Sequence, residues 1–105
     1  MKFKRKHNNS ILDDAYRRYY NNQAITYEEY VIMLATNDEL WFWYNNTEYQ
    51  VAYTIPGMTT MYATKYDGGK KISEYSENYK SIIDMLDNFK INGRCIKDIW
   101  SEVSF

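Results

Sequence analysis

Several residue types are scarce or absent in this chain, and each absence excludes a class of protein. Its 105 residues include a single cysteine, so no disulfide can form within the chain, and a reducing compartment fits best. No apolar run approaches the length of a membrane span, and no hydrophobic segment follows the basic N-terminal residues, as it would in a signal peptide. We therefore expect a cytoplasmic protein that does not use a membrane as partner.

The residue types that carry chemistry are just as few. His7 is the only histidine and Cys95 the only cysteine, so a nucleophile pair would require the N-terminal arm to fold back onto a distant helix. There are no clustered ligands for a metal, and no phosphate-binding or dinucleotide-binding motif occurs. Residues 67–70, Asp-Gly-Gly-Lys, indicate a turn. We expect no enzymatic activity, no metal and no cofactor.

Basic residues are missing from a long central segment, although the net charge is only −1. Residues 1–18 hold six Lys or Arg and two Asp, whereas residues 19–64 hold no base and five acids. Such a segment attracts a basic partner and repels nucleic acid. The second of two expected helices, which a helix-turn-helix protein would insert into DNA, lies within it. We therefore expect no tight binding to bare DNA.

The central stretch from Glu39 to Tyr66 predicts an antiparallel sheet. Asn45-Asn46 separates two runs of β-forming residues, and asparagine tolerates the positive φ of a two-residue type I′ turn. That turn pairs Tyr44 with Thr47 and, farther along, Trp41 with Gln50. Pro56-Gly57 then ends the second strand, and a third is expected over 58–66.

This register divides the hairpin into two faces, because paired residues lie on the same side of a sheet. The expected core face carries Leu40, Phe42, Tyr44, Tyr49, Val51, Tyr53 and Ile55, and the other face carries Trp41, Trp43, Glu48, Gln50, Ala52 and Thr54. Two interpretations of the tryptophan pair are open: cover by the N-terminal helices, which would make a second small core, or an exposed aromatic patch for a partner.

Helices are expected both before and after this sheet along the chain. Ser10 caps the first, Asn21-Asn22 ends it, and Thr26 to Glu29 form a capping box for the second. After a short edge strand over 71–75, Ser76 or Asn78 caps a third helix, and a fourth runs from Ile96 to Val103.

The fold class predicted is α+β: two N-terminal helices, an antiparallel three- to four-stranded sheet, and two C-terminal helices packed on it. Residues 1–9 are expected to be a disordered basic arm, and 10–105 a single α+β domain. The predicted buried residues are Leu40, Phe42, Val51, Ile83, Leu86, Ile99 and Trp100.

One pattern resembles a known group of proteins. The aromatic strand ending in Tyr44, the asparagine turn, Tyr49 on the return strand, and the segments 86–94 (LDNFKINGR) and 96–100 (IKDIW) are similar to short uncharacterised proteins of low-GC Gram-positive bacteria and their phages. The resemblance covers roughly residues 38–103. It implies a fold and a mobile-element context in the cytoplasm of a bacterial host cell, and it supplies no catalytic residues.

Three functions fit these expectations. The first is a non-enzymatic inhibitor, comparable with anti-CRISPR proteins in size and surface, that binds a protein partner such as a CRISPR effector and occludes its basic, nucleic-acid-binding site. The others are a small-ligand (nucleotide) sponge or sensor, and a domain that forms a homodimer through its tryptophans. The residues predicted to bind the partner are Trp41, Trp43, Glu48, Glu28, Glu29, Asp38 and Glu39.

Overall fold

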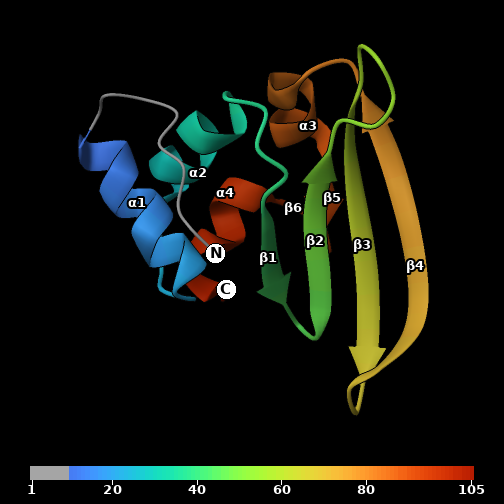
Figure 1. Ribbon diagram of the computed structural model, residues 1–105. Coiled ribbons are helices and arrows are strands. Elements are labelled where there is room, and N and C mark those ends of the chain that lie inside the picture. The colour runs from blue at the N-terminus through green and yellow to red at the C-terminus, as the bar shows by residue number, and fades with distance from the viewer. Residues whose placement is uncertain (1–9) are drawn as a thin grey trace.

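The structure is a computed structural model, and it describes residues 10–105, so the expected basic arm lies outside it. Two helices lead into a four-stranded sheet, followed by shorter elements (Figure 1). In order, the elements are α1 (Ser10–Tyr20), α2 (Tyr27–Leu34), β1 (Trp41–Tyr44), β2 (Thr47–Ala52), β3 (Thr59–Asp67), β4 (Lys70–Tyr79), α3 (Ile82–Asn88), β5 (Lys90–Ile91), β6 (Arg94–Cys95), α4 (Ile96–Ile99) and the 3₁₀ turn η1 (Trp100–Glu102). The predicted α+β class is confirmed.

The β1–β2 hairpin has the predicted register, with Trp41 opposite Gln50 and Tyr44 opposite Thr47. Asn45 and Asn46 have φ values of 50° and 58°, the left-handed pair that a type I′ turn requires. This turn twists in the same sense as the strands, so the hairpin closes without a bulge. Local turn chemistry therefore sets the faces of the sheet.

All four strands of the main sheet are antiparallel, in the order β1-β2-β3-β4. The last strand is longer than expected, since β4 covers 70–79 rather than 71–75, and its register against β3 shifts between Lys65 and Tyr66. At the opposite edge, Ser104 forms a bridge to Trp43, with N···O distances of 2.8 and 2.9 Å. The segment after η1 thus closes the free side of β1.

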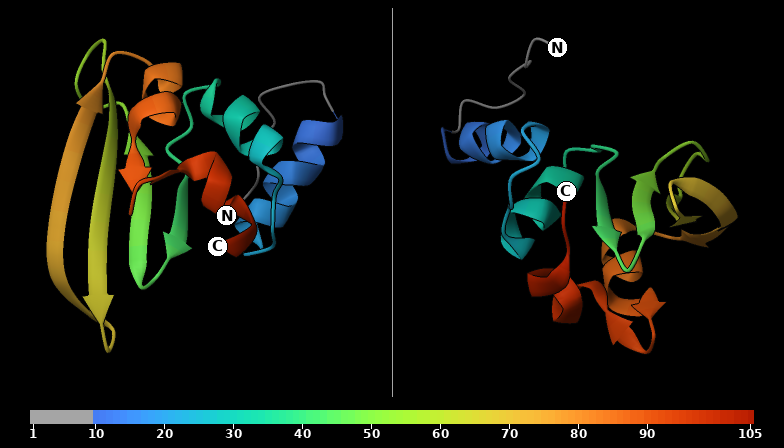
Figure 2. Two further views of the ribbon diagram at one scale, coloured as in Figure 1. Left: turned by 180° about the vertical axis from the view of Figure 1, so that it is seen from behind. Right: turned by 90° about the horizontal axis from the view of Figure 1, so that it is seen from below.

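Helices α3 and α4 and the β5–β6 hairpin cover one face of the sheet, and α1 and α2 lie beside β1. In Figure 1 the covering elements lie behind the sheet, and the reverse view in Figure 2 brings α3 and α4 to the front. Rings from the two layers meet there: Phe89 contacts Tyr49 with centroids 5.9 Å apart, and Tyr30 contacts Phe42 at 5.9 Å. We call this the inner face.

Five of the seven residues predicted to be buried are buried, and Ile83 and Trp100 are not. Leu40, Phe42, Val51, Leu86 and Ile99 are buried as expected. Trp100 is only half-buried: its ring packs on Tyr30 and Phe42, and its indole N–H donates to the Ile25 carbonyl over 2.8 Å. Ile55, expected on the core face, lies beyond the end of β2 and is 42% exposed.

The prediction that Ile83 is buried was wrong, because α3 begins later than expected. Its side chain is 70% exposed. The chain stays extended through Tyr79, and Ser81 caps the helix, its hydroxyl accepting the Asp84 N–H over 3.0 Å. From this start, Met85 and Phe89 lie on one helical face and point into the core, which leaves Ile83 on the solvent side.

The C-terminal helix is also shorter than predicted. Asn92-Gly93 joins the two-residue strands β5 and β6, which the sequence pattern did not reveal. The α-helix then covers only 96–99 and continues as η1, so Val103 is already extended. This early end frees residues 103–105 to reach β1.

Candidate functional site

The outer face of the sheet is the side opposite α3, α4 and the β5–β6 hairpin, and it is turned toward the viewer in Figure 1. The strand registers assign to it Trp41, Trp43, Glu48, Gln50, Ala52, Thr60, Tyr62, Thr64, Tyr66, Lys71, Glu74, Ser76 and Asn78. The tryptophans therefore lie on the face predicted for them. Of the helices in the described part of the chain, α1 contacts this face at Trp41, which is still 37% exposed.

Each tryptophan is supported by one neighbouring ring. Trp41 lies 5.4 Å from Tyr19 of α1, and the Trp41 backbone N–H donates to the Tyr19 hydroxyl over 2.9 Å. Trp43 lies 5.3 Å from Tyr66 of β3. Tyr19 also contacts Tyr20, which is 48% exposed. A row of rings therefore runs from the end of α1 across β1 to β3, held in place by strands and a helix.

Trp43 lines two surface recesses. One, of about 330 Å³, is lined by Trp43, Tyr44, Asn45, Asn46, Glu102 and Ser104. The other, of about 460 Å³, is lined by Trp43, Asn46, Tyr66, Gly68 and Gly69. Trp43 and Asn46 border both recesses, near the turns of the sheet. A large aromatic residue beside recesses is a surface onto which a complementary protein can pack.

Several polar side chains of the outer face are hydrogen-bonded to one another. The Thr60 hydroxyl donates to the Asn78 side chain over 2.7 Å, and Thr64 donates to Glu74 over 3.1 Å. Both threonines are buried although no helix covers them. Glu74 also pairs with Lys71 at 3.3 Å. The two threonine contacts join β3 to β4 across the outer face.

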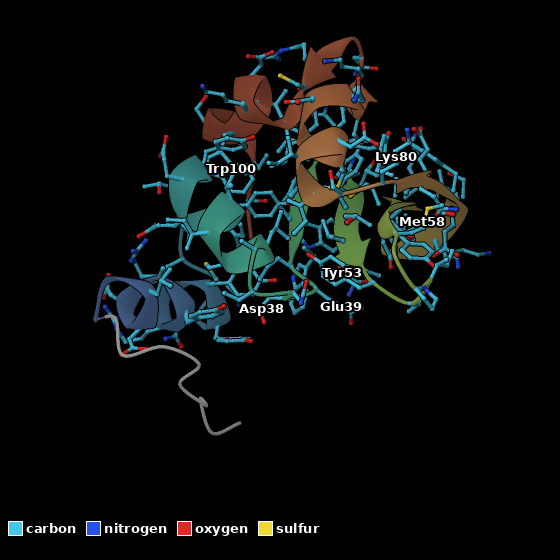
Figure 3. The ribbon with its side chains drawn as sticks, turned by 90° about the horizontal axis from the view of Figure 1, so that it is seen from above. Asp38, Glu39, Tyr53, Met58, Lys80 and Trp100 are labelled. Carbon is cyan, nitrogen blue, oxygen red and sulfur yellow. The ribbon has the colours of Figure 1, made fainter. Side chains whose placement is uncertain are left out.

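The structure does not bring all seven predicted site residues together. Trp41, Trp43 and Glu48 share the outer face, whereas Glu28 and Glu29 lie at the start of α2. Asp38 and Glu39 precede β1 and lie together at one end of the molecule (Figure 3). Tyr62, Tyr66 and Glu74 belong to the outer face but were not predicted, because only the registers of β3 and β4 place them beside the tryptophans.

Among the predicted acids, Glu29 and Asp38 accept hydrogen bonds from side chains of the N-terminal part of the chain. Glu29 accepts two hydrogen bonds from Arg18 of α1, at 3.0 and 2.6 Å, and also accepts the Thr26 N–H in the predicted capping box, which is confirmed. Asp38 accepts hydrogen bonds from the hydroxyls of Tyr16 and Thr36. These contacts tie the first two helices together and to the start of the sheet.

The Arg18–Glu29 pair predicts a pH dependence of stability. Hydrogen bonds from Arg18 lower the pKa of Glu29 below its ordinary value, and burial opposes this only partly. A carboxyl whose pKa is lower in the folded state stabilises the fold above its unfolded pKa, and that contribution disappears as the pH falls through the folded pKa. We expect Arg18→Met to lower the free energy of unfolding by about 1–2 kcal/mol at pH 7, and by progressively less below about pH 4.3.

Urea unfolding of both proteins between pH 3 and pH 7 measures this difference. Lys97→Met is the matched control, since Lys97 is exposed on α4 and far in sequence from both partners. A deficit in Arg18→Met that is equally large at pH 3 and pH 7 would show that the pair stabilises through packing rather than charge.

A cleft of about 600 Å³ lies at the end of the sheet where Glu39 is placed. Glu39, Tyr53, Met58 and Lys80 line it together with Asn37, Ile55, Gly57, Thr59, Ser81 and Ile82 (Figure 3). Glu39 accepts the Tyr53 N–H over 3.2 Å, and the Tyr53 hydroxyl donates to the Leu34 carbonyl over 3.2 Å. Burial, aided by Asp38 and Glu39, raises the pKa of Tyr53 to about 12, so it stays a neutral donor.

Groups suited to catalysis or metal binding are sparse in the described part of the chain. Across residues 10–105, no three His, Cys, Asp or Glu side chains are grouped so that they could hold a metal ion. The Cys95 thiol donates to Asp98 over 3.0 Å, and His7 lies outside the described residues. No helix within this range is long and apolar enough to cross a membrane.

Comparison with known proteins adds no relative from which a role could be transferred. No protein-family model, no curated protein and no solved structure matches the chain. The resemblance to short phage and bacterial proteins therefore stays an expectation from sequence, and the outer face and the end cleft are the surfaces from which a function must be argued.

Proposed function

We propose that this chain is a non-enzymatic binding protein that docks the outer face of its sheet onto a basic surface of a protein partner. In its specific form the partner is a nucleic-acid-binding effector, and the chain is an inhibitor of the anti-CRISPR kind from a phage or mobile element. The open row of rings around Trp43 is the observation that supports this proposal.

The rings on the outer face have the properties of an interface anchor. Trp43 is half-buried, so its backbone and inner edge are already fixed, while the recesses that it lines leave room for a partner. Tryptophan and tyrosine bury large areas at a small cost in conformational entropy, and they dominate the energetic centres of protein interfaces. Because strands hold the rings, docking requires little rearrangement of this surface.

The charges of the outer face support a basic protein as the partner. Glu48 and Glu74 are its acids, and Lys71 is the one base within the set of residues that defines the face. That base is paired with Glu74. Single-stranded nucleic acid also stacks on exposed rings, but it requires cations along the strand for its phosphates. The outer face lacks such a row, so its chemistry favours a protein.

The end cleft supports a nucleotide-binding function less well. Lys80 could meet a phosphate there, and Tyr53 offers a ring. Glu39, however, lines the same cleft, and a carboxylate repels a phosphate at short range. We therefore place the partner on the outer face.

Inhibition of nucleic-acid binding tests the proposal directly. Purified CRISPR effectors of several types would be incubated with the chain, and binding of labelled target DNA would be followed by fluorescence anisotropy. We expect at least one effector to lose DNA binding at a stoichiometric concentration of the chain, and raised salt to weaken the inhibition. Full DNA binding by every effector at a large excess of the chain would refute the anti-CRISPR form of the proposal.

A further inference from the structure

The two edge strands of the main sheet, β1 and β4, differ in whether their outer backbone groups are paired. The backbone of β1 is bridged by Ser104, as described above. The outer edge of β4 has no strand beside it within the described residues, and its side chains from Lys70 to Asn78 are all exposed. A ten-residue strand with one unpaired side presents a row of N–H and C=O groups to which another strand can bind.

The charges along β4 are polarised. Lys70 and Lys71 stand at its beginning, and Glu74 and Glu77 follow in its second part. When two copies of this strand lie antiparallel, the lysines of each copy approach the glutamates of the other. By symmetry the dimer contains two such groups of contacts. A parallel arrangement would place like charges side by side, which is destabilising. The strand is thus complementary to itself in one direction only.

Exposed apolar side chains lie in the middle of the same strand. Ile72 is 54% exposed, and Tyr75 is 51% exposed. Ile72 lies at the register shift between β3 and β4, where the regular pairing is interrupted. An antiparallel copy would cover parts of both side chains in both subunits. Burial of apolar surface would then add to the backbone hydrogen bonds.

We propose that two copies of this chain pair antiparallel along β4 and form a continuous eight-stranded sheet. Lysines and irregular registers commonly protect a free edge from unrelated strands. Here the lysines would have the same effect on most strands. Lys71 already pairs with Glu74 of its own strand, and in the dimer Lys70 of each copy would meet Glu77 of the other. The edge is therefore selective for its own sequence. This inference does not depend on the proposed function.

The symmetry of such a dimer would place both outer faces on the same side. A twofold axis perpendicular to the sheet relates two antiparallel edge strands, and rotation about it keeps each face on its own side. Both tryptophan pairs would then point in one direction. A partner with two copies of its basic site could bind both, which raises the overall affinity without new contacts.

Two oppositely charged variants test the pairing. Lys70→Glu/Lys71→Glu makes β4 acidic, and Glu74→Lys/Glu77→Lys makes it basic. Sedimentation velocity over a range of concentrations is expected to show a dimer for the wild type and a dimerisation constant at least about tenfold weaker for each variant alone. An equimolar mixture of the two variants is expected to regain a dimer, because the acidic strand of one meets the basic strand of the other.

Controls separate this edge from other surfaces. Lys90→Glu/Lys97→Glu carries the same charge change on β5 and α4 and should dimerise as the wild type does, and thermal unfolding confirms that each variant is folded. A wild type that remains monomeric at millimolar concentration would overturn the proposal. So would a dimer that both β4 variants retain, or one that Trp43→Ala dissolves, since the latter would place self-association on the outer face.

Discussion

Replacing Trp43 with alanine should weaken the complex with the partner by about 2 kcal/mol or more, which is the range of interface hot spots. Trp43 lines two recesses, and its one ring contact in the described part of the chain is Tyr66. The backbone bridge from Trp43 to Ser104 does not involve the ring, so it survives the substitution. We expect the fold to survive as well.

Affinity and thermal unfolding must be measured on the same protein to interpret this variant. Isothermal titration with an inhibited effector gives the affinity, and the melting temperature reports on the fold. Gln50→Ala is a matched control, since Gln50 shares the face but is not aromatic. If Trp43→Ala instead lost several kcal/mol of stability while its folded fraction kept full affinity, the outer face would be part of the core and the partner site would lie elsewhere.

Replacing Phe42, the neighbour of Trp43 on the opposite face, should have the contrary effect. Phe42 is fully buried, and its ring contacts Tyr30, Tyr49 and Trp100 at centroid distances of 5.9, 5.2 and 5.6 Å. Truncation to alanine removes these contacts and leaves a cavity between two layers. We expect the free energy of unfolding to fall by about 3–5 kcal/mol.

Urea unfolding at 25 °C measures this loss, and Phe42→Leu is the conservative control, expected to lose much less because most of the volume is kept. The folded fraction of Phe42→Ala should still bind the partner, because its outer face is unchanged. A loss below about 1 kcal/mol would show that the inner face around Phe42 is not the centre of the core.

Substitutions of the predicted acids by lysine differ in whether they also damage the fold. Glu29→Lys would break the ion pair with Arg18 and the helix cap, so a weaker complex could reflect damage to the fold. Glu48 lies on the outer face itself and gives a cleaner measure of electrostatic steering. The charge map of the sequence therefore located an acidic segment, but not which of its acids are available to a partner.

Sequence was informative wherever a feature depends on neighbouring residues. The register of the first hairpin follows from Asn45-Asn46, and the start of α2 follows from the capping box at Thr26. Both signals involve only neighbouring residues, and each is compatible with one local backbone structure. They also placed Trp41 and Trp43 on the outer face, which is the part of the candidate site that could be predicted.

The remainder depends on contacts between distant parts of the chain. The length of β4 was underestimated because an exposed edge strand carries no alternation of apolar and polar residues, and it remains extended because β3 pairs with it. The sequence pattern did not distinguish Ser81 from Ser76 and Asn78 as the residue that caps α3. The helix was therefore predicted to begin too early, and Ile83 was assigned to its buried side. Tyr62 and Tyr66, which also belong to the candidate site, lie on β3. Their position beside the tryptophans depends on how β3 pairs with β2, which only the folded sheet defines.

The bridge between Ser104 and Trp43 has a consequence for how the chain folds as it is synthesised. Trp100 reaches back to the Ile25 carbonyl, and Phe105 packs against Tyr19 with ring centroids 6.0 Å apart. The first two helices and β1 are therefore completed by residues that the ribosome adds about 60 to 86 positions later. Contacts of such long range slow folding, because the intervening chain must be ordered first. The N-terminal half should thus leave the ribosome without its final packing, and a chain arrested before Trp100 should be readily cleaved by proteases.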